Sequence, residues 1–528
     1  MLGTVTSSSL DEFCSEKGSR PGSFPPLSTI EYFMQLYFAH VQPRFPVLHI
    51  PTFEPNGSPA TLLLAIAIVG SSYSESNQGR FALSYLERTR MAIRLMQERD
   101  QKHLRSVEHL LAFFLVSLAA MWIGQKMAYE RAEGDRGELV VSCRRYQLLD
   151  CRVKQQNTSQ PPSRRGRKRI EEAWVEWIDT EQRKRLGLCI YLFDCQVAAF
   201  FQRQPYISKA ETVNAALPCS ETFWNASTAW GWKALLGPAE IPPSTYFLTT
   251  LTTILLYNEI SEVLPFPPLD EFCKTLYAYV LHSHVFEWRQ TICMLNPTGL
   301  LSSPLSLAPQ NIGNSLQERQ RWLQACLKNW DTNYGEASQG DLHNNNRKSS
   351  SGILLYHLAM LALHINFSDL HIVAGRSGSE DDIGLAEQSL RNWLQNERAQ
   401  LILDRTMRIL DAAYDAIAAG DAQRSGFELA ICLFMSGLTC WAMSRFASRS
   451  FILALQQREA PVTSRVPRQD CGIDQGYTQS SNTDCPQAVS SLLVQVADAR
   501  DGLRSLKCHR LAVAFGDILD RFLTEKVQ

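Results

Sequence analysis

The sequence predicts an all-α protein, a large multi-helix domain with disordered loops and a disordered tail. First, apolar residues recur at steps of three and four in long segments, for example residues 80–97 and 105–123. Second, runs of alternating apolar and polar residues, which are typical of half-buried strands, are scarce. Third, 45% of the 528 residues are apolar and 20% are charged, a composition ordinary for a globular protein with a large core.

The chain begins with residues 1–27, which are rich in Ser, Gly and Pro and are predicted to form a disordered tail. A helix is predicted from Ser28, because Ile30, Phe33 and the apolar residues after them fall on one helical face. Ser28 and Glu31 have the spacing of a capping box, which predicts where this helix starts.

One helical regulatory domain is predicted over residues 28–455, with two polar interruptions. These are a basic loop at 152–169 and a polar loop of low complexity at 335–351. Residues 456–486 cannot bury enough apolar surface to order themselves and are predicted to be a disordered linker. Residues 487–528 return to a helical pattern, so we expect C-terminal helices that pack on the main domain.

Charge and cysteine content narrow the function classes. With 52 basic and 53 acidic residues the net charge is −1, so binding to nucleic acid must come from a local patch. None of the 14 cysteines forms a C-x-x-C pair, which favours buried free thiols over disulfides. The longest apolar stretches, 110–124 and 429–443, are shorter than the ~20 residues that span a bilayer. We therefore expect no association with membranes.

The segment YFAHVQPRFPVLHIPTF, residues 37–53, is the most distinctive in the chain. Prolines remove backbone donors and push the preceding residues toward extended geometry, so the part after His40 is predicted to be extended. His40 and His49 are nine residues apart without a nearby Cys, Asp or Glu, which favours packing over a local metal site. The segment is predicted to serve the folding of the chain and to have no reactive or metal-binding role. Its apolar anchors would be Phe45, Val47, Leu48, Ile50 and Phe53.

This segment resembles the opening of the fungal-specific transcription factor domain, the middle homology region of fungal zinc-finger regulators. The family form is an aromatic helix followed by His-Pro-x-Phe-Pro-x-Leu-His-x-Pro-Thr-Phe, and here Val41 and Gln42 intervene before the proline. Residues 177–207 resemble the central helix of the family, and 216–232 resemble its Leu-Pro-Cys segment. The motif residues carried over from the family, with a structural role implied for each, are His40, Pro43, Phe45, Pro46, His49, Pro51, Phe53, Trp177, Asp194, Pro218 and Trp224.

Two later phrases, residues 354–375 and 508–519, resemble the subgroup whose DNA-binding part is a Cys-Cys-His-His finger. The finger pattern itself, C-x₂₋₄-C with H-x₃₋₅-H, does not occur in this sequence, and neither does a six-cysteine binuclear cluster. Either the chain lacks a finger that its relatives carry, or it regulates through a partner that binds DNA. Zinc is expected only in a finger outside this sequence, and no cofactor is expected within it.

The resemblance implies a nuclear regulator of transcription in a fungus, controlling a specialised metabolic pathway or gene cluster. The implied partners are other transcription factors or coregulators, a second copy of the chain, and DNA, directly or through a partner. No catalytic or metal-binding residue is predicted. The alternatives left open are an all-α enzyme of the isoprenoid-synthase kind and a scaffold or corepressor without DNA contact. The acidic stretches 379–388 and 410–420 lack the D-D-x-x-D spacing that such a synthase needs to hold Mg²⁺ and diphosphate.

Charged residues in the central helix have two interpretations. Glu181 and Arg185 are one turn apart and can pair, a contribution of about 0.2–0.5 kcal/mol on an exposed surface. Arg183, Lys184 and Arg185 are predicted to form a solvated helix face, with phosphate contact as the alternative. Asp194 lies in an apolar run, where an unpaired charge is costly. We therefore expect it to hold a buried arginine or a helix N-terminus.

The stretch SRRGRKR, residues 163–169, has five basic residues: Arg164, Arg165, Arg167, Lys168 and Arg169. They are candidates for nuclear import or phosphate contact, and a solvated loop is the alternative. The Arg165-Gly166-Arg167 core is similar to a minor-groove hook, although such a hook normally continues with proline.

Aromatic residues in the second half of the chain raise the question of an effector pocket. Trp288, Trp322 and Trp330 have the helical spacing of core residues, and packing is the favoured interpretation. His357 and His364 share a helical face without a carboxylate pattern beside them, so packing is favoured over zinc. A small apolar effector between helices stays open as a hypothesis.

Overall fold

The chain is described here by a computed structural model in eleven segments. They are residues 24–74, 80–100, 106–150, 166–256, 266–295, 310–335, 350–376, 378–423, 425–457, 486–506 and 510–524. The chain divides into two compact units. Unit 1 is Met1–Val197, Gln204–Tyr277 and Cys508–Arg510, and unit 2 is Ala198–Arg203, Ala278–Lys507 and Leu511–Gln528. Residues 28–455, predicted as one helical domain, thus contribute to both units.

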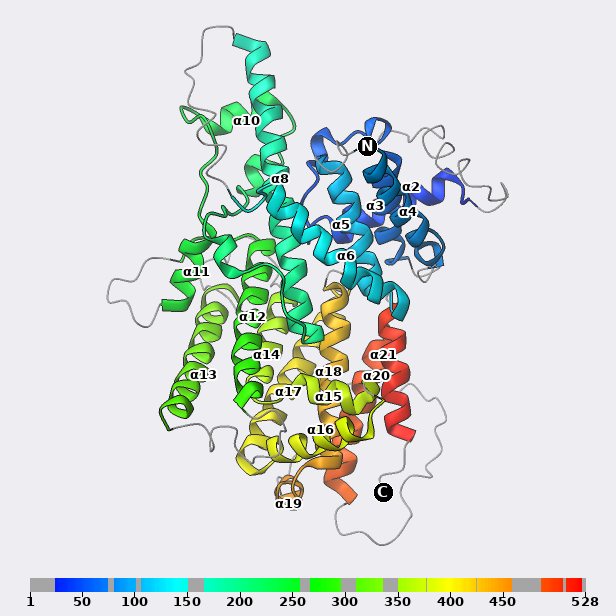
Figure 1. The fold of residues 1–528 in the computed structure, drawn as a ribbon, viewed down its shortest axis with the longest axis vertical. Coiled ribbons are helices and arrows are strands. Elements are labelled where there is room, and N and C mark those ends of the chain that lie inside the picture. Colours follow the sequence, from blue (N-terminus) through cyan, green and yellow to red (C-terminus); the bar gives the residue numbers. More distant parts are fainter. Residues whose placement is uncertain are drawn as a thin grey trace. The chain divides into compact units, whose positions relative to one another are not determined.

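The all-α prediction is confirmed (Figure 1). Within the described segments the regular elements are helices, and the only β pairing is an isolated bridge between Ala216 and Tyr246. The helices of unit 1 are α2 (Leu27–Leu36), η1 (Tyr37–Val41), η2 (Ile50–Thr52), η3 (Pro55–Gly57), α3 (Ala60–Ser71), α4 (Arg80–Arg99), α5 (Val107–Trp122), α6 (Lys126–Arg145), η5 (Lys209–Thr212), α9 (Glu221–Trp224), α10 (Ala229–Leu236) and α11 (Phe247–Leu256). Two further helices, α8 (Gly166–Phe201) and α12 (Glu271–Leu295), begin in unit 1 and contribute their later residues to unit 2.

Helix α3 forms the centre of the N-terminal core in unit 1. Its sequence is apolar all round, and the eleven residues from Thr61 to Ser71 are buried, because α2, α4 and α5 pack around it. A glycine permits the closest of these contacts. A Cβ built on Gly70 would lie 1.9 Å from the backbone carbonyl oxygen of Phe33 on α2. Only a residue without a side chain allows the two helix backbones to approach so closely.

The opening segment corrects two predictions. Helix α2 begins at Leu27 with Pro26 as N-cap and without a side-chain cap, so Ser28 lies inside the first turn and the predicted capping box is wrong. The segment predicted to be extended after the helix is interrupted by the 3₁₀-turn η2. Phe45, Val47 and Leu48 are buried as predicted, whereas Ile50 is 49% exposed because η2 turns its side chain outward.

Unit 2 is built on one largely apolar helix and the helices around it. Its helices are α13 (Gln310–Trp330), η6 (Asp331–Gly335), α14 (Ser350–Ala362), α15 (Phe367–His371), η7 (Ile372–Arg376), α16 (Glu380–Trp393), α17 (Asn396–Ala418), α18 (Gly426–Phe446), α19 (Arg449–Gln457), α20 (Pro486–Ser505) and α21 (Arg510–Thr524). The central helix is α18, which packs against α14, α17 and α20.

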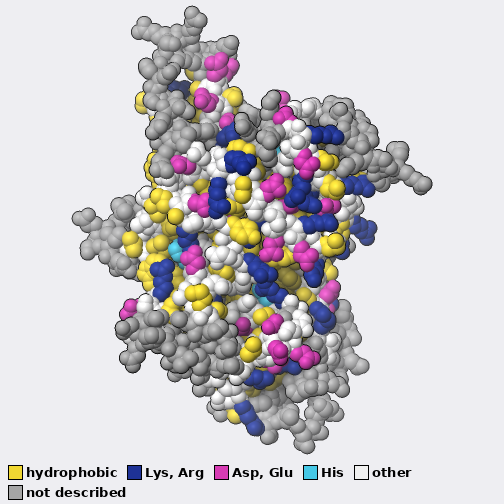
Figure 2. Space-filling model, viewed as in Figure 1, with side chains coloured by type: hydrophobic (Ala, Val, Ile, Leu, Met, Phe, Trp, Pro, Cys, Tyr) yellow, Lys and Arg dark blue, Asp and Glu magenta, His cyan; other side chains and the backbone are white. Residues whose placement is uncertain are grey.

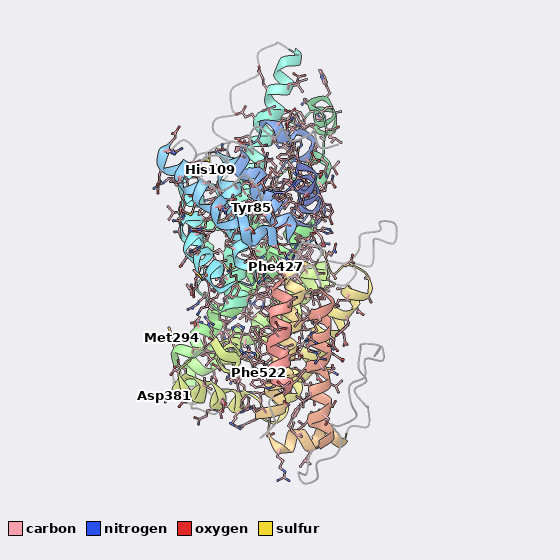
Figure 3. The ribbon with its side chains drawn as sticks, turned by 90° about the vertical axis from the view of Figure 1, so that its right-hand side faces the viewer. Tyr85, His109, Met294, Asp381, Phe427 and Phe522 are labelled. Atoms are coloured by element: carbon pink, nitrogen blue, oxygen red, sulfur yellow. The ribbon has the colours of Figure 1, made fainter. Side chains whose placement is uncertain are left out.

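Helix α18 has 21 residues, more than the apolar stretch 429–443 suggested, because it continues at both ends. By length and composition it would be long enough to cross a membrane. In this structure its apolar window is completely buried, which is how a core helix of a globular unit appears. The aromatic residues of α21 cover part of it, since Phe522, labelled in Figure 3, stacks on Trp441 with ring centroids 4.2 Å apart.

The polar segments are shorter than predicted. Residues 166–169 of the predicted basic loop form the first turn of α8, and Ser350 and Ser351 of the polar loop belong to α14. Helix α19 continues to Gln457 and α20 starts at Pro486, so both ends of the predicted linker are helical. Arg, Lys and Gln are good helix formers, which is why composition alone placed these boundaries too early or too late. The remaining residues of these segments, and residues 1–23 of the tail, lie outside the described part of the chain.

The cysteines of the described segments carry free thiols, as predicted. Eight of the nine are buried, and Cys293 is half-buried. Burial raises the pKa of the Cys143 thiol to about 12, so it is protonated and unreactive at neutral pH.

Candidate functional site

Three motif segments, far apart in the sequence, meet at the side chain of Arg185 in unit 1. Arg185 lies on α8 and is completely buried. Its Nε donates to the Glu181 carboxylate at 3.0 Å, and its Nη1 donates to the backbone carbonyl of Pro46 at 3.3 Å. Its Nη2 donates to the carbonyl of Cys219 at 3.1 Å. We call these residues, with Glu221 and Trp224, the Arg185 node. The node ties the proline segment and the Leu-Pro-Cys segment to the central helix.

The remaining contacts of the node satisfy its charges. Glu221 accepts from Arg185 Nη1 at 3.2 Å, and Glu181 also pairs with Lys184 at 2.5 Å. The Glu181 carboxylate accepts the backbone N–H of Cys219 at 2.8 Å. The guanidinium of Arg185 lies 4.3 Å from the ring centroid of Trp224, a cation–π contact.

Arg185 is therefore not on a solvated face, and that prediction is wrong. The segment that covers it, from Cys219 to Trp224, is more than 30 residues away in the sequence, so helical spacing did not show the burial. The exposed-pair energy estimated from the sequence does not apply to this site. Breaking a buried pair by removing one partner costs about 3–5 kcal/mol, because it leaves an uncompensated charge in the interior.

His49 belongs to the same structure but not to an acid–base site. It is buried, and its Nδ1 lies 2.8 Å from Thr52 Oγ1. Its ring meets Trp224 edge-on at 4.8 Å and Trp174 at 5.7 Å. Burial lowers the pKa of His49 to about 4, so the ring is neutral at physiological pH and packs as an aromatic residue.

The protonation states of Glu181 and Cys219 are consistent with a structural role for the Arg185 node. Burial alone would raise the pKa of Glu181, but Lys184 and Arg185 outweigh it and lower the pKa, so the carboxylate stays ionised. Burial raises the pKa of Cys219 to about 12, so its thiol is no nucleophile. The node thus holds the Glu181 carboxylate and the Arg185 guanidinium as a buried ion pair.

Asp194 forms a second buried pair in unit 1, with the buried arginine that was one of the two partners expected from the sequence, and it also accepts from two backbone groups of a loop. Its Oδ1 accepts from Arg136 Nη1 at 2.8 Å, and its Oδ2 accepts the backbone N–H groups of Tyr206 and Ile207, each at 2.7 Å. The guanidinium of Arg136 lies 3.9 Å from the ring of Tyr206. The pair fixes the chain after α8 against α6.

The other motif residues have mixed surroundings. His40 is half-buried and stacks on Tyr73 at 5.1 Å, and Phe53 contacts Phe38 at 5.5 Å. Pro46 is buried, Pro218 is half-buried, and Pro43 and Pro51 are exposed. Burial therefore varies along the motif, and the exposed prolines act through backbone geometry alone.

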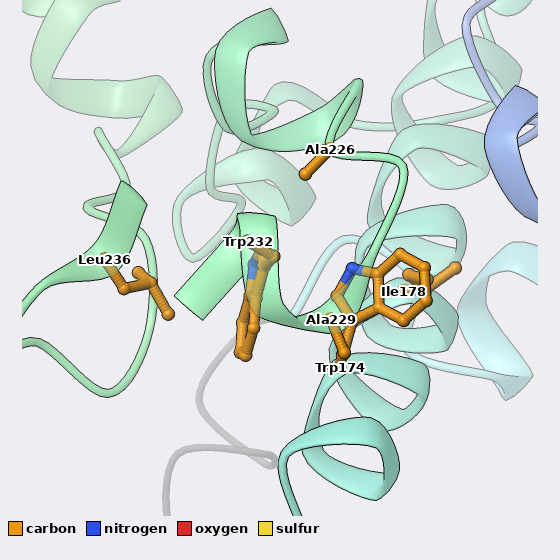
Figure 4. Packing of buried hydrophobic residues seen from close by; sticks show 6 residues of the cluster. All are labelled: Trp174, Ile178, Ala226, Ala229, Trp232 and Leu236. Carbon is orange, nitrogen blue, oxygen red and sulfur yellow. The ribbon is translucent and has the colours of Figure 1, made fainter. Parts of the chain in front are cut away.

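Trp177 lies beside a separate small core between α8 and α10, in which buried apolar residues pack together (Figure 4). Its members are Trp174, Ile178, Ala226, Ala229, Trp232 and Leu236. Three large apolar residues of the same two helices remain on the surface: Val175 is 59% exposed, Trp230 51% and Leu235 46%. Each is a large apolar side chain exposed at the edge of this small core.

The candidate import residues are only partly placed by the structure. Arg167, Lys168 and Arg169 lie in the first turn of α8, whereas Arg164 and Arg165 lie outside the described residues. On the face of the molecule in Figure 2, basic and acidic side chains are interspersed, without a large area of one sign. The described surface in that view therefore has no extended basic patch.

The acidic stretches and histidines considered from the sequence do not assemble into a site. Asp381 and Asp382 on α16 and Asp411 and Asp415 on α17 are exposed. Within the described segments no group of three or more His, Cys, Asp or Glu residues could hold a metal ion. His364 Nε2 instead lies 3.2 Å from the side-chain amide nitrogen of Gln324.

The tryptophans considered for an effector pocket are in part core residues. Trp330 and Trp288 are buried. Trp322 is half-buried beneath the guanidinium of Arg319, which lies 4.0 Å from its ring centroid. A pocket of unit 2 does exist, but Arg289 lines it and none of these tryptophans does. The same signal that marked Asp194, a charge inside an apolar run, would have found Arg289 in the stretch YVLHSHVFEWRQTIC.

The known proteins that this chain matches include named transcription factors of fungi. The family model described as the fungal specific transcription factor domain matches residues 34–326, more than half of the chain, and the chain belongs to that family. The resemblance inferred from the motif segments is thereby confirmed.

Three relatives show how far the similarity extends. The "nicotinate catabolism cluster-specific transcription factor" of Emericella nidulans is 24% identical over 79% of this chain and 47% of its own length. A "transcription factor" of Gibberella fujikuroi is 26% identical over 45% of this chain and 30% of its own length. The "zinc finger protein klf1" of Schizosaccharomyces pombe is 22% identical over 79% of this chain and 51% of its own length. The chain thus spans about half or less of these curated relatives, and no solved structure matches it.

The lowered pKa of His49 predicts a loss of stability in mild acid. The unfolded chain binds a proton at this residue below pH 6.5, whereas the folded chain does not until about pH 4. The stabilisation is therefore complete above pH 6.5 and is lost as the pH falls toward 4, at up to about 1.4 kcal/mol per pH unit.

The variant His49→Asn isolates this effect. Between pH 7.5 and 5.5, we expect the wild type to lose about 1.4 kcal/mol more unfolding free energy than the variant. Urea denaturation at both pH values, followed by circular dichroism, measures the difference. Parallel losses in the two proteins would show that His49 does not carry the effect.

Proposed function

We propose that this chain is the helical regulatory domain of a nuclear transcription regulator that controls a metabolic gene cluster in a fungus. The observation that carries the proposal is the family match over residues 34–326, whose central motif segments meet at the Arg185 node. The relative from Emericella nidulans is named for a catabolic gene cluster, which supports control of a cluster over control of a general housekeeping process.

The proposed mechanism is regulation through contacts between macromolecules. The buried ion pairs make unit 1 a fixed body, and the exposed side chains of Val175, Trp230 and Leu235 offer an apolar surface to another protein. The proposed partners are other transcription factors or coregulators, and a second copy of the chain. DNA would be bound directly or through such a partner. Zinc would enter only through a finger outside this sequence, as the name of the relative klf1 suggests for that protein.

The experiment that tests the proposal follows a tagged copy of the protein in its host. We expect discrete chromatin occupancy, and purified protein assayed on the occupied sequences then separates direct DNA binding from recruitment by a partner. Replacing Arg164, Arg165, Arg167, Lys168 and Arg169 with Ala should reduce the nuclear to cytoplasmic ratio several-fold. The control replaces three exposed basic residues of α13, Arg319, Arg321 and Lys328, with Ala, which should leave localisation unchanged.

The outcomes separate the two parts of the proposal. Unchanged localisation of the five-residue variant would refute the import role of the basic stretch alone. Absence of the wild-type protein from chromatin would refute the regulatory function and would return the enzyme and scaffold hypotheses to first place.

A further inference from the structure

Arg289, on α12 in unit 2, is a buried cation without a carboxylate partner. It is 3% exposed. Its Nη2 donates to the backbone carbonyls of Ala362 and Ile365, the latter at 3.0 Å, at the C-terminal end of α14. Its Nε and Nη1 have no hydrogen-bond partner, and no carboxylate of the described residues lies within ion-pair distance. An unpaired buried charge is costly, so its retention requires an explanation.

The side chain of Arg289 lines a pocket of unit 2. The space measures about 220 Å³, including its opening to solvent. His282 lines the same pocket and is 1% exposed, and its Nε2 also has no partner. The walls are otherwise mostly apolar, with Phe286, Ile365 and Phe367. Two buried polar side chains with free nitrogens therefore face one small, largely apolar space.

Aromatic, cationic and acidic side chains surround Arg289. The guanidinium of Arg289 lies 4.7 Å from the ring centroid of Trp393. Burial lowers its pKa to about 10, so it remains charged at neutral pH. Burial, together with the nearby Arg289, Arg405 and Arg398, lowers the pKa of His364 to about 4, which shows how many cations act on this part of unit 2. The nearest acid that acts on Arg289 is Asp369, whose Oδ2 is taken by the hydroxyl of Ser389 at 2.7 Å.

A purely structural role accounts for only part of this arrangement. A cation at the C-terminal end of a helix interacts favourably with the helix dipole, and the two carbonyls satisfy Nη2. That role leaves Nε and Nη1 of Arg289 and Nε2 of His282 unexplained. A guanidinium holds oxyanions through charge-assisted hydrogen bonds. Because Nη2 is committed to the two carbonyls and Nε and Nη1 lie on different edges, each of these two nitrogens can donate only singly to one oxyanion.

We propose that this pocket binds the oxyanion group, carboxylate or phosphate, of a small metabolite. Arg289 supplies the charge and a free N–H, His282 supplies a further polar contact, and the apolar walls accommodate a short carbon skeleton. The volume is below the range of about 300–1,000 Å³ of drug-sized sites, so the ligand is compact. One oxygen would occupy the inner space and the rest of the ligand would extend into the opening. A role of this ligand as a regulatory effector rests on the proposed function, whereas its binding does not.

The test uses the full chain, purified and titrated with sodium phosphate or sodium succinate at constant ionic strength, with sodium chloride making up the balance. We expect a saturable rise of about 2–4 °C in the melting temperature with one of the two anions, which also identifies the oxyanion. The variant Arg289→Gln should abolish the rise. The matched control Arg319→Gln removes an arginine that also stacks on a tryptophan but is exposed, and it should retain the rise.

A second variant covers the case in which Arg289→Gln does not fold. Ile365→Phe adds bulk at the pocket while the guanidinium and the Ile365 carbonyl remain, so it should also abolish the saturable rise. A rise without saturation, an equal rise in Arg289→Gln, or full retention in Ile365→Phe would each overturn the proposal. The assay contains no DNA, so its failure is distinguishable from failure of the proposed regulatory function.

Discussion

Replacing Arg185 with Met should cost unit 1 about 3–5 kcal/mol of stability, a large fraction of what a folded domain has. The change leaves the buried Glu181 carboxylate without its closest arginine, and it removes the donor to the carbonyls of Pro46 and Cys219. Lys184 still pairs with Glu181, so the loss lies in that range and is not larger. Urea denaturation followed by circular dichroism, together with the steady-state amount of protein in the host, measures it.

Arg183→Met is the matched control, because Arg183 lies on the same helix two residues away. Its pair with Asp179 is 2.8 Å long, but the two side chains are 30% and 50% exposed. Such a pair contributes only about 0–1 kcal/mol. A double variant, Arg185→Met with Glu181→Gln, removes the uncompensated charge and should recover part of the loss. Equal effects of Arg185→Met and Arg183→Met would show that the node does not stabilise the unit.

Replacing Gly70 with Ala should destabilise the N-terminal core by about 3 kcal/mol, the upper end of the usual cost of overpacking. The new Cβ would lie 1.9 Å from the Phe33 carbonyl oxygen and 2.9 Å from the Tyr37 nitrogen. Both are backbone atoms, so neither can move aside as a flexible side chain would, and α2 must shift as a whole. Thermal and urea denaturation of the full chain test this expectation.

Gly134→Ala is the control, for which we expect the opposite change in stability. Gly134 lies inside α6 and is exposed, and nothing lies within 4 Å of the position its Cβ would take. Alanine is the better helix former, so this change should stabilise the protein by up to about 1 kcal/mol. If both substitutions stabilised or both were neutral, close packing of α2 on α3 would not be required for the fold.

The helices could be predicted from the sequence because their apolar residues recur with helical spacing, and the motif segment from Tyr37 to Phe53 also identified the family. A buried partner for Asp194 could be predicted from the sequence, because a carboxylate inside an apolar run is costly to bury without one. The burial of Arg185 could not be predicted in this way. Whether a helical face is covered depends on another segment of chain, and periodicity within the helix does not contain that information.

Other errors have physical reasons of the same kind. Ile50 was expected in the core because it is apolar, but a 3₁₀-turn that composition did not indicate directs it outward. Ser28 has the right neighbour for a capping box, but Pro26 starts the helix one residue earlier. The apolar run around Arg289 indicates that this arginine is buried, but only the three-dimensional arrangement shows that two of its nitrogens have no partner.

The Arg185 node also affects how the protein is made. Arg185 reaches back 139 residues to the Pro46 carbonyl and forward 36 residues to Glu221, so the contacts form late on the ribosome. When residue 200 has emerged, Pro46, Glu181 and Lys184 are already present, but Cys219, Glu221 and Trp224 have not been synthesised. Contacts between distant residues slow folding and lengthen exposure of apolar surface. The node is therefore completed only after the Leu-Pro-Cys segment has been made.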